Sequence, residues 1–132
     1  MKHLYEFLLS KDNAKDVTNA PLDKDETGDA ALEYLGEKFC NKFDIRKLRT
    51  GNVELILKNI EYKVPGGLHT CDRLKFTLYV NSKPMTIRRA YGYTNALKHT
   101  EEWQSPASKM KDYNSIEELC DDFKNWISKH GY

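Results

Sequence analysis

The sequence predicts an α+β fold in which helices pack on one face of a three-stranded, or at most four-stranded, antiparallel sheet, in the order α-α-β-β-β-α. Three observations predict this fold. A helical stripe of apolar residues spans 30–43, apolar residues alternate along 53–93, and a second stripe with its own cap spans 115–130. A length of 132 residues suits one domain with a single core, which we expect over 30–132.

The N-terminal segment predicts a short docking helix over residues 1–10. Leu4, Phe7 and Leu8 fall on one side of that helix, which is too short to be stable alone and must pack on the domain or on a partner. Residues 11–29 are polar and predict an irregular connection. The helix over 30–43 follows, with Asp29 as its expected N-cap.

Alternation of apolar residues predicts the strands. The first strand runs over 53–64 and contains a phase slip at Lys58–Asn59, which predicts a β-bulge, because a tight hairpin would favour glycine there. Further strands are expected over 74–80 and 85–93. Arg89 falls at an inward position of the last strand, so we expect an irregularity or a strand end near it. Residues 94–114 predict a loop.

The C-terminal helix carries the most complete set of local signals. Ser115 and Glu118 have the spacing of a capping box, and Gly131 stands where a C-terminal cap belongs. Apolar residues between them fall on one helical stripe, namely Ile116, Leu119, Cys120, Phe123 and Ile127.

The net charge of +1 conceals an uneven distribution. Residues 44–100 hold 11 Lys and Arg against 4 Asp and Glu, a charge of +7, whereas residues 1–43 and 101–132 each carry −3. The positive block coincides with the expected strands. Charge of this kind bears on the choice of partner rather than on the fold.

A basic sheet face is the first candidate site. If the alternating apolar residues point inward, the opposite face carries Glu61, Lys63, Lys75, Thr77, Tyr79, Thr86 and Arg88. Lysine and arginine around a tyrosine can hold a phosphate backbone and stack a base. The alternative is an ordinary solvated sheet, on which Lys, Thr and Tyr are common.

A second group of cations could grip carboxylates or phosphates of an anionic partner. It comprises Arg88 and Arg89, followed by Tyr91 and Tyr93, together with Arg46, Lys47 and Arg49. The alternative is that these arginines balance the acidic final helix. The binding residues predicted from both groups are Lys63, Lys75, Tyr79, Arg88, Arg89, Tyr91, Arg46 and Arg49.

The expected order helix-strand-strand-strand-helix from residue 30 onward resembles the double-stranded-RNA-binding domain. In that family a basic cluster at the start of the final helix contacts phosphates. Here the corresponding residues are Ser115-Ile116-Glu117-Glu118, which are acidic, so the resemblance extends to element order and to no binding residue.

No catalytic residue, metal ligand or cofactor is predicted. His69 and Cys71 are the one place where reactive side chains cluster, and the other Cys and His residues lack zinc-site spacing relative to them. Cys40 and Cys120 fit core positions. An odd number of widely spaced cysteines, with no apolar span and no secretory leader, predicts an intracellular, cytoplasmic protein with reduced thiols.

Three functions fit these observations. The first is a small non-catalytic accessory protein, of phage or mobile-element origin, that acts through protein contacts and exposes an aromatic patch around Tyr91, Tyr93 and Trp103. The second is a nucleic-acid-binding module that uses the basic sheet face. The third is an enzyme without a recognisable motif, which should show a pocket holding titratable residues. A protein partner is favoured, no membrane contact is expected, and the N-terminal helix offers a route to homo-oligomers.

Overall fold

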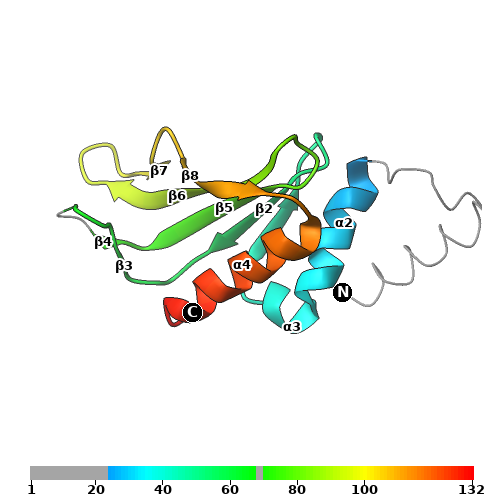
Figure 1. Cartoon of the computed structure of the whole chain (residues 1–132). Coiled ribbons are helices and arrows are strands. Elements are labelled where there is room, and N and C mark those ends of the chain that lie inside the picture. The colour runs from blue at the N-terminus through cyan, green and yellow to red at the C-terminus, as the bar shows by residue number, and fades with distance from the viewer. Residues whose placement is uncertain (1–23, 68–69) are drawn as a thin grey trace, which may run out of the picture.

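The computed structural model describes residues 24–67 and 70–132 of the chain (Figure 1). It contains a six-stranded antiparallel sheet in the order β1-β2-β5-β6-β7, with β8 also paired to β6, and a two-stranded sheet of β3 and β4. The expected single sheet of three or four strands, and the order α-α-β-β-β-α, are therefore wrong. The resemblance to the double-stranded-RNA-binding domain in element order is lost with them.

The elements are α2 (Lys24–Leu35), α3 (Glu37–Cys40), β1 (Asp44–Lys47), β2 (Val53–Leu57), β3 (Tyr62–Lys63), β4 (Thr70–Cys71), β5 (Arg73–Tyr79), β6 (Met85–Asn95), β7 (Thr100–Trp103), β8 (Ser108–Tyr113) and α4 (Ile116–Lys129).

The helix expected over 30–43 is in fact two helices. α2 begins before residue 30, so Asp29 lies inside it rather than at its cap, buried and paired with Lys47 of β1. Gly36 has a φ of 91°, a conformation that glycine adopts without strain and that ends α2 before the single turn of α3. The expected docking helix and most of the expected connection, residues 1–23, lie outside the described part of the chain.

The phase slip at Lys58–Asn59 marks the point at which the chain leaves the large sheet, not a bulge within one strand. β2 ends at Leu57, and Asn59 adopts a φ of 57°, a left-handed conformation that asparagine tolerates better than most residues. The chain then enters the small sheet, where Tyr62 lies opposite Cys71. One alternating pattern thus serves two sheets, and alternation alone cannot tell them apart.

β6 is the longest strand, and the two edge strands β7 and β8 pair with different parts of it. Its first part pairs with β8 and its last part with β7. The register with β8 shifts between Thr86 and Arg88, next to the position where an irregularity was expected, but the strand continues to Asn95. β7 and β8 occupy the segment 94–114, where a loop was expected. Most of their side chains are exposed, so they lack the apolar alternation of a buried strand.

The core lies between the helices and one face of the curled large sheet (Figure 1). Phe123 of α4 is fully buried, with its ring centroid 4.9 Å from that of Phe76 on β5 and 5.5 Å from that of Phe39 on α3. Burial of one such side chain contributes about 1.5–3 kcal/mol. Cys40 and Cys120 are buried on the same side, as expected of core cysteines.

α4 confirms the predicted C-terminal helix. Ser115 Oγ accepts a hydrogen bond from the Glu118 backbone N–H at 3.1 Å. The return bond of the capping box is displaced by one residue, because Glu118 Oε2 accepts from the Asn114 N–H at 3.1 Å. Two otherwise unpaired donors at the start of the helix are satisfied in this way.

Candidate functional site

The face of the large sheet that points away from the helices carries Lys75, Tyr79 and Arg88. We call it the uncovered face and define it by these three residues with Glu54 and Thr77. They share one side because Glu54 and Arg88 both lie opposite Thr77 in the register of β2, β5 and β6. No helix among residues 24–67 and 70–132 packs on this face (Figure 1).

The uncovered face has mixed charge rather than a continuous basic surface. Arg46 of β1 lies opposite Glu54 of β2, and Lys109 of β8 forms an ion pair with Asp112 at 2.8 Å. Arg88 donates to a backbone carbonyl at 3.3 Å. The positive charge counted along the strands is therefore partly compensated in three dimensions.

Trp103 packs on the same side of the sheet between two cations. The Arg73 guanidinium carbon lies 5.0 Å from the ring centroid and Lys75 Nζ lies 4.6 Å from it. Gly92 makes this packing possible, because a Cβ at that position would lie 2.8 Å from Arg73 Cβ and 2.9 Å from Trp103 Cζ3. Arg73 also pairs with Glu101 at 3.1 Å, so this cluster holds β5, β6 and β7 together.

Arg89 and Tyr91 point to the opposite face, which the helices cover. Arg89 lies opposite Phe76 in the β5–β6 register, and its guanidinium carbon is 4.9 Å from the Trp126 ring of α4. Tyr91 is buried and stacks on Tyr62 with ring centroids 5.3 Å apart. Neither residue shares a surface with Arg88.

The remaining predicted binding residues are dispersed. Lys63 is exposed on β3 of the small sheet, and Arg49 is exposed in the turn between β1 and β2. Arg46 lies on the edge strand β1. The structure brings Lys75, Tyr79, Arg88 and Arg46 onto one face and leaves the other four elsewhere.

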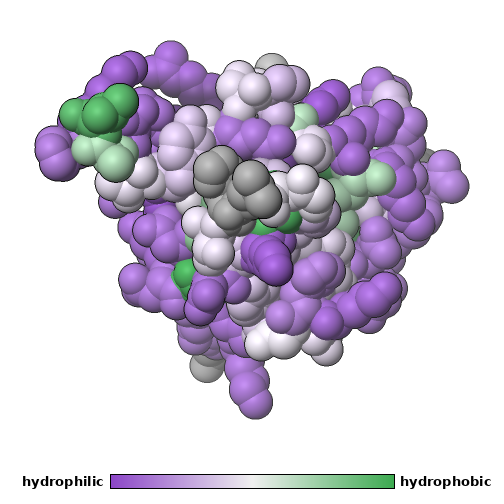
Figure 2. Space-filling model, turned by 90° about the vertical axis from the view of Figure 1, so that its left-hand side faces the viewer, coloured by the Kyte–Doolittle hydropathy of each residue, from purple (hydrophilic) through white to green (hydrophobic). Residues whose placement is uncertain are grey.

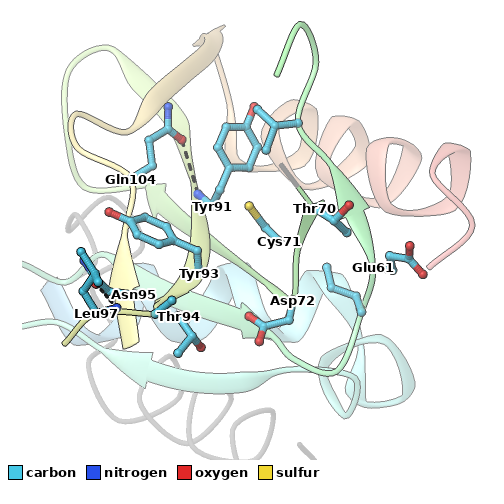
Figure 3. Close-up of a pocket in the computed structure, with 13 residues that line it drawn as sticks. Glu61, Thr70, Cys71, Asp72, Tyr91, Tyr93, Thr94, Asn95, Leu97 and Gln104 are labelled. Atoms are coloured by element: carbon cyan, nitrogen blue, oxygen red, sulfur yellow. Dashed lines mark hydrogen bonds between the residues drawn. The ribbon is translucent and has the colours of Figure 1, made fainter. Parts of the chain in front are cut away.

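A pocket of about 1040 Å³ lies where β4 of the small sheet faces the end of β6. We call it the β4–β6 pocket. Its apolar and aromatic lining comes from Ile60, Val64, Cys71, Tyr91, Tyr93, Ala96 and Leu97. Its polar lining comes from Glu61, Thr70, Asp72, Thr94, Asn95 and Gln104. Figure 3 shows the Cys71 sulfur directed into the pocket toward Tyr91, and the Glu61 carboxylate directed away from it.

Local hydrogen bonds hold the walls of this pocket in place. The Tyr91 N–H donates to Gln104 Oε1 at 3.4 Å (Figure 3). The Gln104 N–H donates in turn to the Tyr91 carbonyl at 2.8 Å. At the tip of the β6–β7 hairpin, Asn95 Oδ1 accepts from the backbone N–H groups of Leu97 at 3.0 Å and Lys98 at 3.1 Å. This side-chain turn presents Leu97 to solvent with 93% of its surface exposed.

Two titratable groups of the pocket, Cys71 and Tyr93, have pKa values raised above their ordinary values. Burial, and then the nearby Asp72 carboxylate, raise the pKa of the Cys71 thiol. A hydrogen bond to Glu102 raises the pKa of Tyr93. A nucleophilic cysteine needs the opposite shift. Among residues 24–67 and 70–132, no three His, Cys, Asp or Glu side chains gather as a metal site would require. His69 lies outside the described residues.

Sequence reasoning missed most of this pocket. The residues from Asn95 to Leu97 fell in an expected loop, and Ile60 was assigned to the bulged strand expected over 53–64. One local signal was available: Leu97 is a large apolar residue within the otherwise small and polar run Thr94-Asn95-Ala96-Leu97-Lys98. The meeting of β4 with β6 has no local signal, because it depends on the small sheet folding back.

Comparisons with known proteins leave the site to be interpreted from its own geometry. The chain matches no protein-family model, no curated protein and no solved structure. Within the described part of the chain, no helix is both long enough and apolar enough to cross a membrane.

Proposed function

We propose that this chain is a non-catalytic binding module that holds an apolar segment of a protein partner in the β4–β6 pocket. One observation carries the proposal. The described residues expose three large apolar side chains, and two of them, Tyr93 and Leu97, line this pocket. The third, Tyr34, lies on α2. A single exposed leucine is ordinary, but apolar side chains gathered at a concavity are typical of a partner site.

The surroundings of the pocket support this reading. Figure 2 views the molecule from the side where β3, β4 and the β6–β7 hairpin lie, and shows separate apolar areas in green within a mostly polar surface. An apolar floor with a polar rim is the usual anatomy of a protein interface. The hydrogen-bonded walls mean that a partner would meet a preformed site and would lose little entropy in ordering it.

The charges at the pocket favour a partner segment with neutral or basic flanks. None of the described lining residues is Lys or Arg, and Asp72 contributes a carboxylate whose charge Arg73 offsets at 2.9 Å. Glu102 forms hydrogen bonds with the side chains of Tyr93 and Asn95 and adds negative charge near the pocket. An acidic segment would therefore be repelled.

A peptide-display selection against the immobilised protein tests the proposal. The selected peptides are then titrated against Leu97→Asp and Tyr93→Ala. Loss of one buried leucine contact costs about 1.5–3 kcal/mol, so each peptide should lose affinity by about tenfold or more with Leu97→Asp. Tyr34→Ala is the matched control, because Tyr34 is 42% exposed and Tyr93 is 40% exposed.

Peptides that bind Tyr34→Ala as they bind the unaltered protein, and that lose affinity with both pocket variants, support the proposal. Failure to select any peptide would contradict it. Peptides whose affinity is the same for all the variants would also contradict it, because they must bind elsewhere.

Nucleic-acid binding through the uncovered face is the second candidate function. It is supported by the side chains of Lys75, Tyr79 and Arg88, which lie on a face that no described helix covers. Fluorescence-anisotropy titration with short single- and double-stranded DNA and RNA tests it. Affinity should fall steeply with salt and should be lost in Lys75→Glu with Arg88→Glu. Absence of binding at low salt would remove this candidate.

A further inference from the structure

Arg89 is a partly buried cation without a carboxylate partner among the described residues. Its guanidinium carbon lies 4.9 Å from the Trp126 ring, 5.5 Å from the Tyr91 ring and 5.9 Å from the Tyr62 ring. These rings attract the cation but accept few of its N–H groups. Its one side-chain hydrogen bond within the described residues runs from Nη2 to Tyr91 Oη at 3.2 Å, and its buried Nε–H has no acceptor there.

The buried part of this cation lacks the pairing that a folded protein normally provides. Buried charges are normally paired or fully hydrogen-bonded, because removal from water costs several kcal/mol that must be offset. A guanidinium carries five N–H groups in a planar fork, and that fork matches carboxylate and phosphate oxygens. Because no counter-ion to Arg89 lies among the described residues, we look for an anion that binds from outside them.

The guanidinium borders a groove of about 310 Å³ between β6, β8 and α4. The other lining residues are Ser108, Lys109, Met110 and Trp126. Ser108 lies opposite Arg89 in the β6–β8 register and offers a hydroxyl donor on the same face. Lys109 lies opposite Arg88, so its side chain points to the uncovered face, where it pairs with Asp112 at 2.8 Å. None of the five lining residues is acidic. The groove is at the small end of the range for ligand sites, which fits one compact group rather than a chain.

We propose that this groove binds an oxyanion, a carboxylate or a phosphate group, through the Arg89 guanidinium, with the Ser108 hydroxyl as a second donor. The anion supplies the charge that Arg89 lacks. The indole of Trp126 forms the apolar side of the site. This site does not depend on the proposed protein-binding function, because the groove and the β4–β6 pocket share no lining residue.

Trp126 provides the readout. The chain has two tryptophans, so Trp103→Phe leaves Trp126 as the only one. Trp126 fluorescence is measured in this background during titration with inorganic phosphate, with acetate, and with chloride at matched ionic strength. We expect a saturable change with phosphate or acetate and none with chloride. The stronger of the two oxyanions identifies the ligand class.

Arg89→Met keeps an unbranched side chain against the three rings and removes the charge. It should weaken oxyanion binding by at least about tenfold, because a charge-assisted hydrogen bond is lost. Ser108→Ala changes an exposed position, so it serves as a folded test if Arg89→Met fails to fold. Ser108→Ala should weaken oxyanion binding by about two- to fivefold. Lys109→Gln, whose side chain lies on the opposite face, is the matched control and should leave oxyanion binding unchanged. Equal responses to chloride and phosphate, or unchanged affinity in Arg89→Met or Ser108→Ala, would overturn the proposal.

Discussion

Replacement of Phe123 by alanine should remove a fully buried contact between α4 and the sheet. Phe123 is fully buried, and three rings surround it with centroids 4.9 Å (Phe76), 5.5 Å (Phe39) and 5.7 Å (Phe43) away. Truncation of a buried phenylalanine costs about 3–5 kcal/mol, more where the neighbours cannot close the cavity. Phe76 is fixed in the central strand β5, so collapse is limited. We expect a loss of about 4 kcal/mol in the free energy of unfolding.

Urea unfolding, followed by tryptophan fluorescence and far-ultraviolet circular dichroism, measures this loss. Leu97→Ala is the control, because a side chain that is 93% exposed should contribute less than about 0.5 kcal/mol. A loss below about 1.5 kcal/mol for Phe123→Ala would refute the account of the core. So would an equal effect of the two substitutions.

Three further predictions concern stability. Ser115→Ala should lower the free energy of unfolding by about 1 kcal/mol in a thermal melt, because the cap hydrogen bond is lost. Ser115→Thr should keep most of the stability that this bond contributes. Equal melting temperatures of the three proteins would contradict the role of Ser115 as a helix cap. Gly92→Ala should cost about 1–3 kcal/mol in urea, because its Cβ would meet Trp103, and no loss would contradict that close packing. Burial raises the pKa of Cys40 to about 11 and that of Cys120 to about 12. Unfolding exposes both thiols at an ordinary pKa of 9.0, so the unfolded state releases protons first and stability should fall as the pH rises above about 9; a flat profile from pH 8 to 10 would contradict this.

Local signals predicted the elements that bury a face. The capping pair Ser115 and Glu118 located α4, and clean alternation over 74–80 located β5. In both cases the pattern and the burial have the same cause, since each element has one apolar side turned to the core. The period of two also placed Lys75, Tyr79 and Arg88 on one side of the sheet.

Elements that bury little were not predictable in the same way. β7 and β8 are edge strands with exposed side chains, and charged residues such as Lys109 and Lys111 keep such edges from pairing with other chains. The breaks at Gly36 and Asn59 depend on single backbone conformations. The apolar stripe continues past Gly36 because Phe39 and Phe43 still face the core.

The candidate site could not be predicted without the three-dimensional fold. Arg88 and Arg89 are adjacent in sequence, so in a strand they must point to opposite faces, and a shared patch was excluded by the same alternation that placed Arg88. The β4–β6 pocket joins residues from the small sheet to the tip of a hairpin in the large one. No local pattern encodes that meeting, and only Leu97 marked it in the sequence.

Chemical-shift mapping by NMR tests the central claim most directly. A peptide from the display selection is added to ¹⁵N-labelled protein, and the backbone amide signals are followed. We predict that the largest shifts fall on Cys71, Tyr91, Tyr93 and Leu97 around the β4–β6 pocket, with Lys75 and Arg88 unmoved. Shifts confined to Lys75, Tyr79 and Arg88 would place binding on the uncovered face and would contradict the account.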